Sequence, residues 1–219
     1  MASPASTTAA RTTRPSADGT RDRILAAALD LFSERSFEGA TTREIAARAG
    51  VTQPLLNYHF RSKEYLWQAS VDRLFGELDR ALSARVEGLR GVDELSAAKL
   101  VVREFIYFSA AHPQLHRIMM QECKVDGTRI DWLVDRHIRP LYEMTAALFS
   151  RLVELGRVPA VPATNLYYVI TGAAATIFVL APECRRLGGF DPLERDAVEV
   201  HADVVTRLLF GPGEDGTSR

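Results

Sequence analysis

The residues best suited to contact another molecule lie in the segment 52–63, which combines turn-forming residues with polar and aromatic side chains. A short helix is expected here, because Thr52 suits the capping position and Pro54 suits the first helical turn. Side chains advance by about 100° per residue, so Leu56 and Phe60 share one side of the helix and are predicted to be buried. The side chains left facing outward are those of Gln53, Pro54, Leu55, Asn57, Tyr58 and His59. Amides can pair with adenine edges and apolar groups can contact thymine methyls, so this mixed face favours a DNA major groove.

A preceding helix and a glycine turn are expected to hold this surface in place. Ile45 and Ala49 recur at helical spacing after Thr41 and Thr42, whose side chains suit a helix start. Gly50 can adopt a positive φ at no cost from a Cβ atom, which allows a sharp turn out of that helix. An earlier helix offers both of these short helices an apolar stripe, formed by Ile24, Leu25, Ala28, Leu31 and Phe32. Two short helices around a glycine also occur in all-α proteins that bind no nucleic acid, so the geometry alone leaves DNA binding open.

Residues 20–66 resemble the N-terminal domain of the tetracycline-repressor-like (TetR) family of transcriptional regulators. The resemblance is carried by the run RDRILAAALDLFSERSFEGATTREIAARAGV and by the closing F-x-S-K-E-x-L pattern from Phe60 to Leu66. It implies that double-stranded operator DNA is bound by Thr42, Arg43, Thr52, Gln53, Pro54, Leu55, Asn57, Tyr58, His59 and Lys63. Leu55 and Asn57 depart from the commonest family pattern, which has a small polar residue and a tyrosine there. The resemblance therefore implies how the helix docks and leaves the base sequence open.

The sequence predicts an all-α fold with an N-terminal three-helix helix-turn-helix domain and a larger C-terminal helical domain for ligand binding and dimerisation. The pattern stays helical beyond residue 66, with no sustained alternation of period two. The expected divisions are a disordered tail at 1–19, the DNA-binding domain at 20–65 and the effector-binding and dimerisation domain at 66–212. A long helix from Ser62 should join the two domains. Arg11 and Arg14 in the tail could enter a minor groove or simply be solvated.

Two C-terminal helices, at about 163–180 and 192–210, are the candidates for a homodimer interface. The predicted contact residues, small or apolar at helical spacing, are Gly172, Ala175, Val198, Ala202, Val205 and Leu209. Packing inside one subunit could use the same residues. The resemblance implies pairing through the last two long helices, and a two-fold dimer engages two half-sites of a palindromic operator.

The middle of the chain is rich in aromatic and sulfur-containing side chains that could line an apolar pocket. The candidates are Phe105, Phe108, Ser109, His116, Met119, Met120, Trp132, His137 and Tyr142. They could equally form a filled core, since such residues at helical spacing usually pack together. The resemblance implies a ligand cavity in this region. Such a pocket suits a hydrophobic or aromatic small molecule, oriented by His116, His137 or Tyr142. Pro140 is expected to bend or break the helical segment 130–155.

Several other classes of site find little support. His112 and His116 have a spacing that could suit a metal, but Pro113 intervenes and no third ligand is nearby, so no metal or cofactor is expected. The chain lacks a nucleophile elbow, a phosphate-binding loop or a Cys and His arrangement, so an enzyme is not expected. No signal peptide is visible, and the longest apolar run, 167–182, is interrupted and short for a bilayer, so a cytoplasmic location without a membrane partner is expected.

These features predict a one-component transcriptional regulator. We expect a repressor that binds a palindromic operator as a dimer and is released by a small hydrophobic or aromatic effector. The net charge of −1 argues against indiscriminate nucleic-acid binding and suits a few placed phosphate contacts. The alternative is a ligand-binding helical protein without operator-specific DNA binding. That alternative predicts a degraded DNA-contacting helix, whereas the one in this sequence is intact. Operator sequence, effector identity, regulated genes and the sign of regulation are left open.

Overall fold

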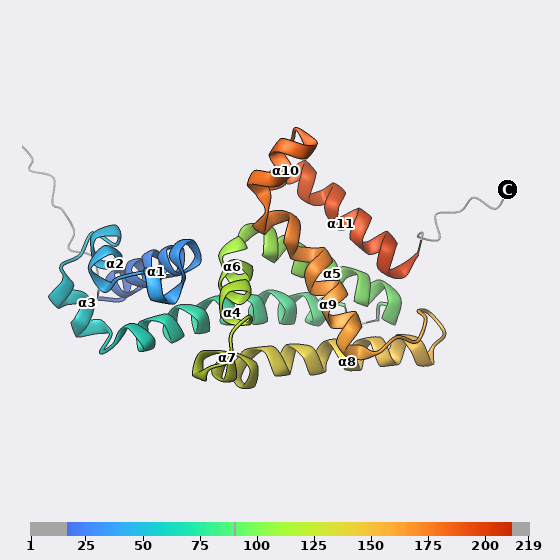
Figure 1. Ribbon diagram of the computed structural model, residues 1–219. Coiled ribbons are helices and arrows are strands. Elements are labelled where there is room, and N and C mark those ends of the chain that lie inside the picture. Colours follow the sequence, from blue (N-terminus) through green and yellow to red (C-terminus); the bar gives the residue numbers. More distant parts are fainter. Residues whose placement is uncertain (1–16, 90, 212–219) are drawn as a thin grey trace, which may run out of the picture.

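The computed structural model describes residues 17–89 and 91–211, and every regular element in those ranges is a helix (Figure 1). This confirms the all-α prediction. The elements are α1 (Ala17–Gly39), α2 (Thr42–Arg48), α3 (Gln53–His59), α4 (Lys63–Glu87), α5 (Glu94–Ala111), α6 (Pro113–Glu122), α7 (Thr128–Leu133), the π-helical turn η1 (Val134–Ile138), α8 (Arg139–Glu154), α9 (Ala163–Val179), α10 (Ala181–Gly188) and α11 (Arg195–Phe210). Of the predicted tail, residues 1–16 with Arg11 and Arg14 lie outside the described residues. Residues 17–19 already belong to α1.

The N-terminal helices α1, α2 and α3 share one core. The predicted stripe on α1 is almost fully buried, and so are Ile45 on α2, Leu56 on α3 and Phe60 after it. Thr20 is buried inside α1, which begins three residues earlier at Ala17. Burying these apolar side chains fixes the angle between the two short helices.

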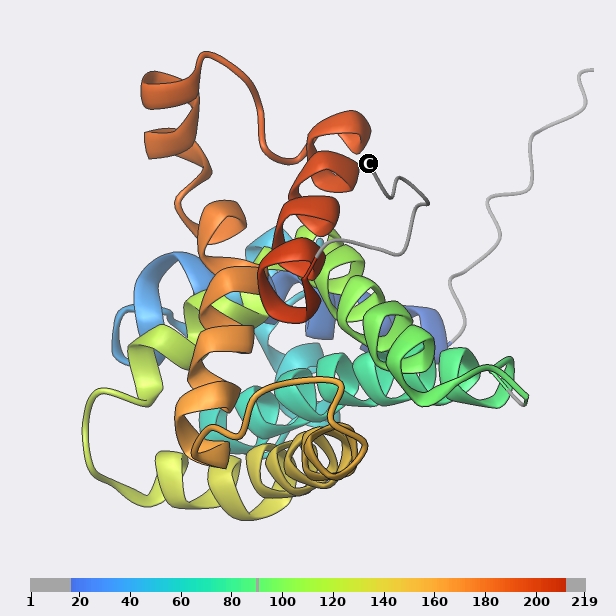
Figure 2. The same ribbon diagram turned by 90° about the vertical axis from the view of Figure 1, so that its right-hand side faces the viewer.

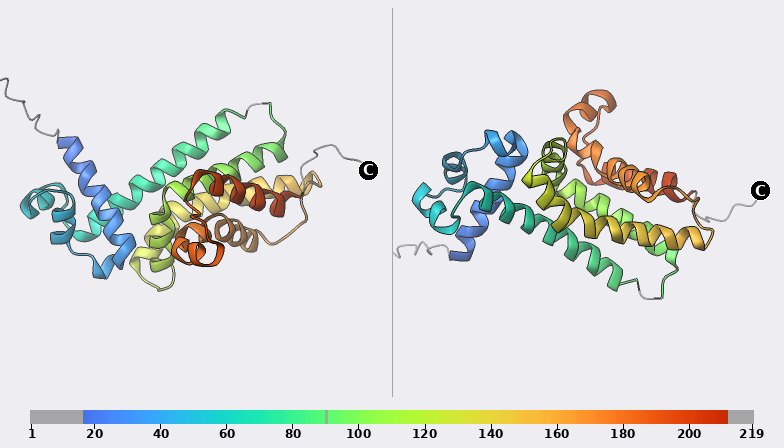
Figure 3. Two further views of the ribbon diagram at one scale, coloured as in Figure 1. Left: turned by 90° about the horizontal axis from the view of Figure 1, so that it is seen from above. Right: turned by 60° about the horizontal axis from the view of Figure 1, so that its bottom comes forward.

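The long helix α4 links this N-terminal unit to the larger group of helices, as Figures 1 and 3 show. It starts where predicted, and the Tyr65 N–H donates to the Ser62 Oγ at 3.0 Å, which caps its first turn. The helix α6 also touches α1, because Gln114 donates to the Asp30 carboxylate (3.2 Å) and Gln121 donates to the Ser33 carbonyl (3.0 Å). The N-terminal unit is therefore held by two elements of the larger domain.

The larger domain is built around α5, which packs against α4, α9 and α11 (Figure 2). Arg103 on α5 bridges to α11 through Glu199 (2.9 Å) and Asp203. The sequence predicts a loop around 185–191, yet residues 181–188 form α10, a short helix bent by 76° from α9. Pro182 lies in its first turn, where the missing N–H costs little. In Figure 1 α10 projects away from the rest of the domain.

The predicted break near Pro140 takes the form of the π-helical turn η1 immediately before it. The Arg139 N–H donates to the Val134 carbonyl, which is a wider turn than in an α-helix. Pro140 has no N–H and cannot continue the regular ladder of hydrogen bonds, so one wider turn absorbs the irregularity.

Within 17–89 and 91–211, no helix taken singly has the length and apolar character for a bilayer crossing, and only the bent pair α9 and α10 together would meet that test.

Candidate functional site

The short helix α2 is fixed by a reciprocal pair of hydrogen bonds at its start. The Glu44 N–H donates to the Thr41 Oγ1 (3.2 Å), and the Thr41 N–H donates to the Glu44 carboxylate (3.3 Å). Gly50 follows the helix at φ +64°, the region that glycine occupies without a steric cost. The predicted glycine turn is confirmed, and it delivers the chain directly into α3.

The helix α3 exposes nearly all of its side chains. Only Leu56 is buried, and Tyr58 is 84% exposed. Gln53, Pro54, Leu55 and Asn57 also face solvent, as the angular argument predicts. A folded subunit gains nothing from exposing Leu55 and Tyr58 on a helix seven residues long. The surface is therefore available to a partner with both apolar and polar groups.

Two details around α3 differ from the sequence expectation. Thr52 occupies the position before the helix but makes no capping hydrogen bond, so its exposed hydroxyl is left for an outside partner. Lys63 donates to the Glu38 carbonyl (3.4 Å) and lies 4.5 Å from the centre of the Phe37 ring. A lysine side chain is flexible, and it has to leave these contacts to reach a phosphate.

Basic groups surround this helix. Arg43 is exposed and has no hydrogen bond or ion pair with the residues that the structure describes. Arg61, which the sequence interpretation missed, is exposed at the end of α3, with its guanidinium 5.1 Å from the Tyr65 ring. The one signal for Arg61 was its position directly after the buried Phe60. Thr42 on α2 accepts a hydrogen bond from Gln53 (3.4 Å), which ties the start of α2 to α3.

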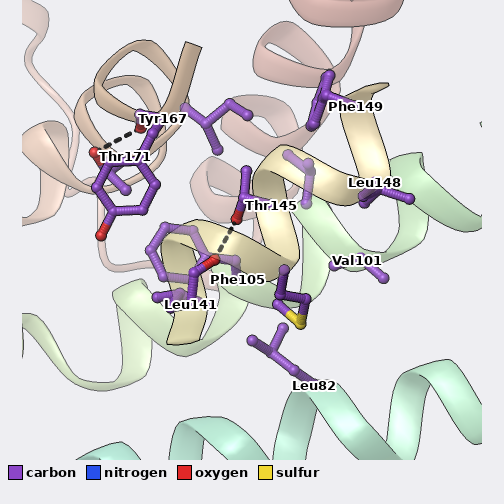
Figure 4. A pocket seen from close by; sticks show the side chains of 12 residues that line it. Leu82, Val101, Phe105, Leu141, Thr145, Leu148, Phe149, Tyr167 and Thr171 are labelled. Atoms are coloured by element: carbon purple, nitrogen blue, oxygen red, sulfur yellow. Dashed lines mark hydrogen bonds between the residues drawn. The ribbon is translucent and has the colours of Figure 1, made fainter. Parts of the chain in front are cut away.

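A second candidate site is a hollow of about 290 Å³ between α4, α5, α6, α8 and α9, here called the central cavity. Four predicted pocket residues line it, namely Phe105, His116, Met119 and Met120. A smaller side pocket of about 40 Å³ adjoins it between α5, α8 and α9 (Figure 4). The two share Phe105, Leu141, Tyr167 and Thr171 as wall residues. Sequence reasoning missed the contributions of α4, α8 and α9, because those residues look like ordinary core positions.

The other predicted pocket residues lie outside the central cavity. Phe108 is buried in the core against His112, and Trp132 packs on Trp67 with ring centres 5.5 Å apart. Tyr142 shares a hydrogen bond of 3.1 Å with Thr164. Ser109 is fully buried behind the wall of the cavity, where it meets His116 at 2.9 Å. These positions correct the predicted lining, since periodicity shows which face is buried but not whether that face meets a void.

His137 packs against the middle of α4 and does not line the central cavity. Its ring stacks on Phe75 of α4, with centres 4.3 Å apart, and its Nε2 lies 2.9 Å from the Asp72 carboxylate. Arg136 binds the same carboxylate at 2.5 Å. Burial lowers the pKa of His137, against the opposing effect of Asp72. Among the described residues, no group of three or more His, Cys, Asp or Glu side chains is placed to hold a metal ion.

The predicted dimer stripe is corrected in part. Val198, Ala202 and Val205 are buried inside the subunit on the side of α11 that faces α5 and α9. Ala175 is buried as well, whereas Gly172 is exposed and Leu209 is partly buried. The apolar residues that α11 turns outward are Val200, Val204 and Leu208, which are 63%, 48% and 79% exposed. They follow one another at intervals of four residues and so form one outer stripe.

A family profile described as "Bacterial regulatory proteins, tetR family" matches residues 24–69, which span the helix-turn-helix and the start of α4. Residues 24–69 therefore form a DNA-binding domain of TetR type. The chain is 27% identical over 166 residues to the HTH-type transcriptional regulator RutR of Escherichia coli (strain K12), covering 76% of this chain and 77% of RutR. It is 44% identical over 54 residues to the tetracycline repressor protein class A from transposon 1721 of Escherichia coli, 25% of each chain.

The fold of the chain is similar to that of AibR, whose crystal structure was solved in complex with isovaleryl coenzyme A and operator DNA. The TM-score is 0.71, with 21% sequence identity, covering 88% of this chain and 99% of AibR. At that identity the likeness shows the shared fold. The helix-turn-helix of TetR type occupies the N-terminal position identified from the sequence.

Proposed function

We propose that this regulator is a repressor that binds a palindromic operator as a homodimer in the cytoplasm and is released by a small apolar effector. In this proposal residues 20–65 contact DNA, and residues 66–212 bind the effector and form the dimer. The observation that carries the proposal is the exposed face of α3, where Leu56 alone is buried. A ligand-binding protein without a DNA role has no use for that surface.

The proposed DNA contacts divide by chemistry. Gln53, Leu55, Asn57 and Tyr58 face outward where base edges would lie in a major groove, and Pro54 adds apolar contact. The phosphate contacts proposed are those of Thr42, Arg43, Thr52, His59 and Lys63, to which the structure adds Arg61. A single helix of this length makes few contacts, so the affinity depends on two copies bound to two half-sites.

The proposed dimer uses the outer stripe of α11, Val200, Val204 and Leu208, together with Gly172 and Tyr168 of α9, which are exposed in the subunit and also line the central cavity. An apolar stripe on the surface of one subunit is typical of a protein–protein interface. The interface supports DNA binding because a two-fold axis repeats every contact of α3.

The proposed release works through α4. Phe75 lines the central cavity from α4 and stacks on His137, while Asp72, one turn before Phe75, binds Arg136 and His137. An effector in the cavity therefore touches the helix that begins beside α3. If the effector favours a conformer whose α3 helices no longer match two major grooves, operator affinity falls by the same factor by which DNA weakens effector binding. AibR was solved with both a ligand and operator DNA, which supports two sites on this fold.

We assign the cavity to binding rather than catalysis. Ser109 and His116 lie at hydrogen-bond distance, but Ser109 is fully buried and donates its hydroxyl hydrogen to the Phe105 carbonyl (2.7 Å). A nucleophilic serine has to reach a substrate carbonyl and give its proton to the histidine. The geometry of this pair satisfies neither condition.

The proposal is tested by measuring operator affinity for the variant that carries both Gln53→Ala and Tyr58→Ala. We expect a loss of at least tenfold in affinity for the DNA upstream of the regulated genes, with an unchanged dimer and melting temperature, because both side chains are exposed. Val125→Ala, an exposed apolar side chain remote from α3 in sequence, is the matched control. Unchanged operator affinity in the double variant contradicts the proposal. So does a wild-type protein that prefers no duplex over random competitor.

A further inference from the structure

The walls of the central cavity and side pocket carry no charge. None of the described residues that line either hollow is Asp, Glu, Lys or Arg. In the side pocket, Thr145 donates to the Leu141 carbonyl (2.8 Å) and Thr171 donates to the Tyr167 carbonyl (2.9 Å), as Figure 4 shows. Both threonine hydroxyl hydrogens are therefore used by the helices, and the side pocket presents an apolar surface.

His116 lines the central cavity and has one hydrogen-bond acceptor that no described residue uses. The Ser109 hydroxyl has one hydrogen, and the Phe105 carbonyl, 2.7 Å away, can only accept it. The His116 Nε2, at 2.9 Å from the same oxygen, must then be the donor. In a neutral imidazole the Nδ1 is left without a hydrogen, and no described residue donates to it. Burial lowers the pKa of His116 to about 4, so the ring is neutral at physiological pH.

Tyr167 presents the complementary hydrogen-bond donor. It lines both hollows, and its hydroxyl has no hydrogen-bond partner among the described residues. Burial raises its pKa to about 12, so the hydroxyl keeps its proton. The central cavity thus contains the neutral His116 acceptor and the neutral Tyr167 donor, together with the hydroxyls of Tyr168 and Thr176 and the Cys123 thiol, in an otherwise apolar wall.

We propose that the effector is an uncharged, mainly apolar molecule whose hydroxyl group donates to the His116 Nδ1 and accepts from the Tyr167 hydroxyl. This rests on the proposed function, because it concerns the same effector site. A hydroxyl can donate and accept at once, which matches the His116 acceptor and the Tyr167 donor. The volume of about 290 Å³ holds roughly ten water-sized groups, so the ligand is small.

Charged ligands fit this cavity poorly. A carboxylate would meet the lone pair of the His116 Nδ1 and find no cation in the wall, and an ammonium group would find no carboxylate. Burying a charge without a partner is strongly unfavourable. A large polyanionic ligand is also too big for a cavity of about 290 Å³. The effector site of this chain is therefore selective for neutral molecules.

The test compares probes that share one apolar skeleton and differ in their polar end. Isothermal titration calorimetry of the full chain at pH 7.5 is done with 4-butylphenol, butylbenzene, 4-butylbenzoate and 4-butylbenzylamine. We expect 4-butylphenol to bind most tightly and butylbenzene about tenfold more weakly. The benzoate and the benzylamine should bind at least a hundredfold more weakly than the phenol. A benzoate or benzylamine that binds as tightly as the phenol overturns the proposal, and so does the absence of binding by all four probes.

A variant separates the proposed hydrogen bond from general apolar binding. Tyr167→Phe removes one hydroxyl. It should lower the affinity for 4-butylphenol about tenfold and leave the affinity for butylbenzene unchanged. Tyr142→Phe is the matched control, because its hydroxyl bonds Thr164 outside the cavity, and both affinities should stay as in the wild type. Equal phenol affinity in Tyr167→Phe and the wild type overturns the proposed contact.

A separate operator titration keeps the two proposals distinguishable. If 4-butylphenol binds in the predicted order but leaves operator affinity unchanged, effector-driven release is wrong and the neutral-ligand site stands. If operator binding responds to the benzoate and not to the phenol, release stands and the neutral-ligand site is overturned.

Discussion

His116 shows how one buried side chain can be both a ligand contact and a source of pH dependence. Its ring lies edge-on to Phe105, with centres 5.7 Å apart, and its Nε2 is engaged by Ser109. The enclosure disfavours the charged imidazolium, which is why the pKa falls from 6.5 to about 4. The unfolded chain therefore takes up a proton at a higher pH than the folded protein does.

The first prediction concerns stability at low pH. The folded pKa of His116 lies below its unfolded value, so its contribution to stability is present above pH 6.5 and is lost as the pH falls toward 4. Between pH 7.5 and pH 5 this loss is about 2 kcal/mol. Urea unfolding at pH 7.5 and at pH 5 measures the change in the free energy of unfolding. We expect this free energy to fall less in His116→Gln than in the wild type, by about 2 kcal/mol. His137 and His201 titrate in both proteins and do not affect the difference. If the free energy of unfolding fell equally in the wild type and in His116→Gln, His116 would have to protonate freely in the folded state.

The second prediction concerns Arg43, which is exposed and unpaired among the described residues. If it binds a phosphate, Arg43→Ala should weaken binding to all duplexes alike. The logarithmic salt dependence of operator binding should also become shallower by about 0.9 for each phosphate that is no longer neutralised, or nearly two for a dimer. Fluorescence anisotropy over a series of salt concentrations measures the slope. Arg186→Ala on the projecting helix α10 is the control and should leave the slope unchanged. A base-specific loss with an unchanged slope would assign Arg43 to base reading.

At the scale of elements, the junction between α4 and η1 lies next to the central cavity, because Phe75 of α4 both lines the cavity and stacks on His137. The π-helical turn places Arg136 and His137 where both can bind Asp72. Such turns are frequent at functional positions, because they rotate side chains relative to a regular helix. The contact ties η1 to the middle of α4.

The third prediction tests this junction. Asp72→Asn removes the negative charge that both Arg136 and His137 contact. The effect of 4-butylphenol on operator affinity should therefore become smaller, with a coupling free energy reduced by about 1 kcal/mol. Effector affinity in the absence of DNA should change little. Asp79→Asn is the matched control on the same helix, since Asp79 is exposed and makes no ion pair with the described residues. Full coupling in Asp72→Asn would place the link elsewhere, for instance in the contact between α6 and α1.

At the scale of the whole molecule, one apolar side of α11 is buried in the subunit and the other is exposed. Val198, Ala202 and Val205 complete the core of the subunit, while Val200, Val204 and Leu208 remain outside. A stripe exposed on one subunit is buried when a second copy packs on it, which stabilises the assembly through the hydrophobic effect. Operator affinity then depends on the concentration of the dimer.

The fourth prediction separates these two sides. Val204→Asp should convert the dimer to a monomer in light scattering after size exclusion and lower operator affinity at least tenfold. Its secondary structure should be kept, because Val204 faces outward. Val205→Asp should instead destabilise the subunit by several kcal/mol, because it buries an unpaired charge. Val86→Asp, an exposed valine on α4, is the control and should remain dimeric. A dimeric Val204→Asp protein would move the interface to another surface.

The sequence by itself determined the local arrangement around α3, because the capping Thr41 of α2, the turn residue Gly50 and the positions of Leu56 and Phe60 all act over a few residues. Those features specify which side chains of one short helix cannot be buried, and the structure has the same ones exposed. The position of the break before Pro140 followed from the same kind of local reasoning.

Only the tertiary structure decided which face of α11 is inside and where the cavity lies. Both faces of α11 carry apolar residues at helical spacing, so periodicity cannot rank them, and the choice depends on contacts with α5 and α9 from distant parts of the chain. The cavity is a mismatch of shape among five helices. A void has no sequence pattern of its own, and therefore Tyr167 could not be told from a core tyrosine until the helices around it were in place.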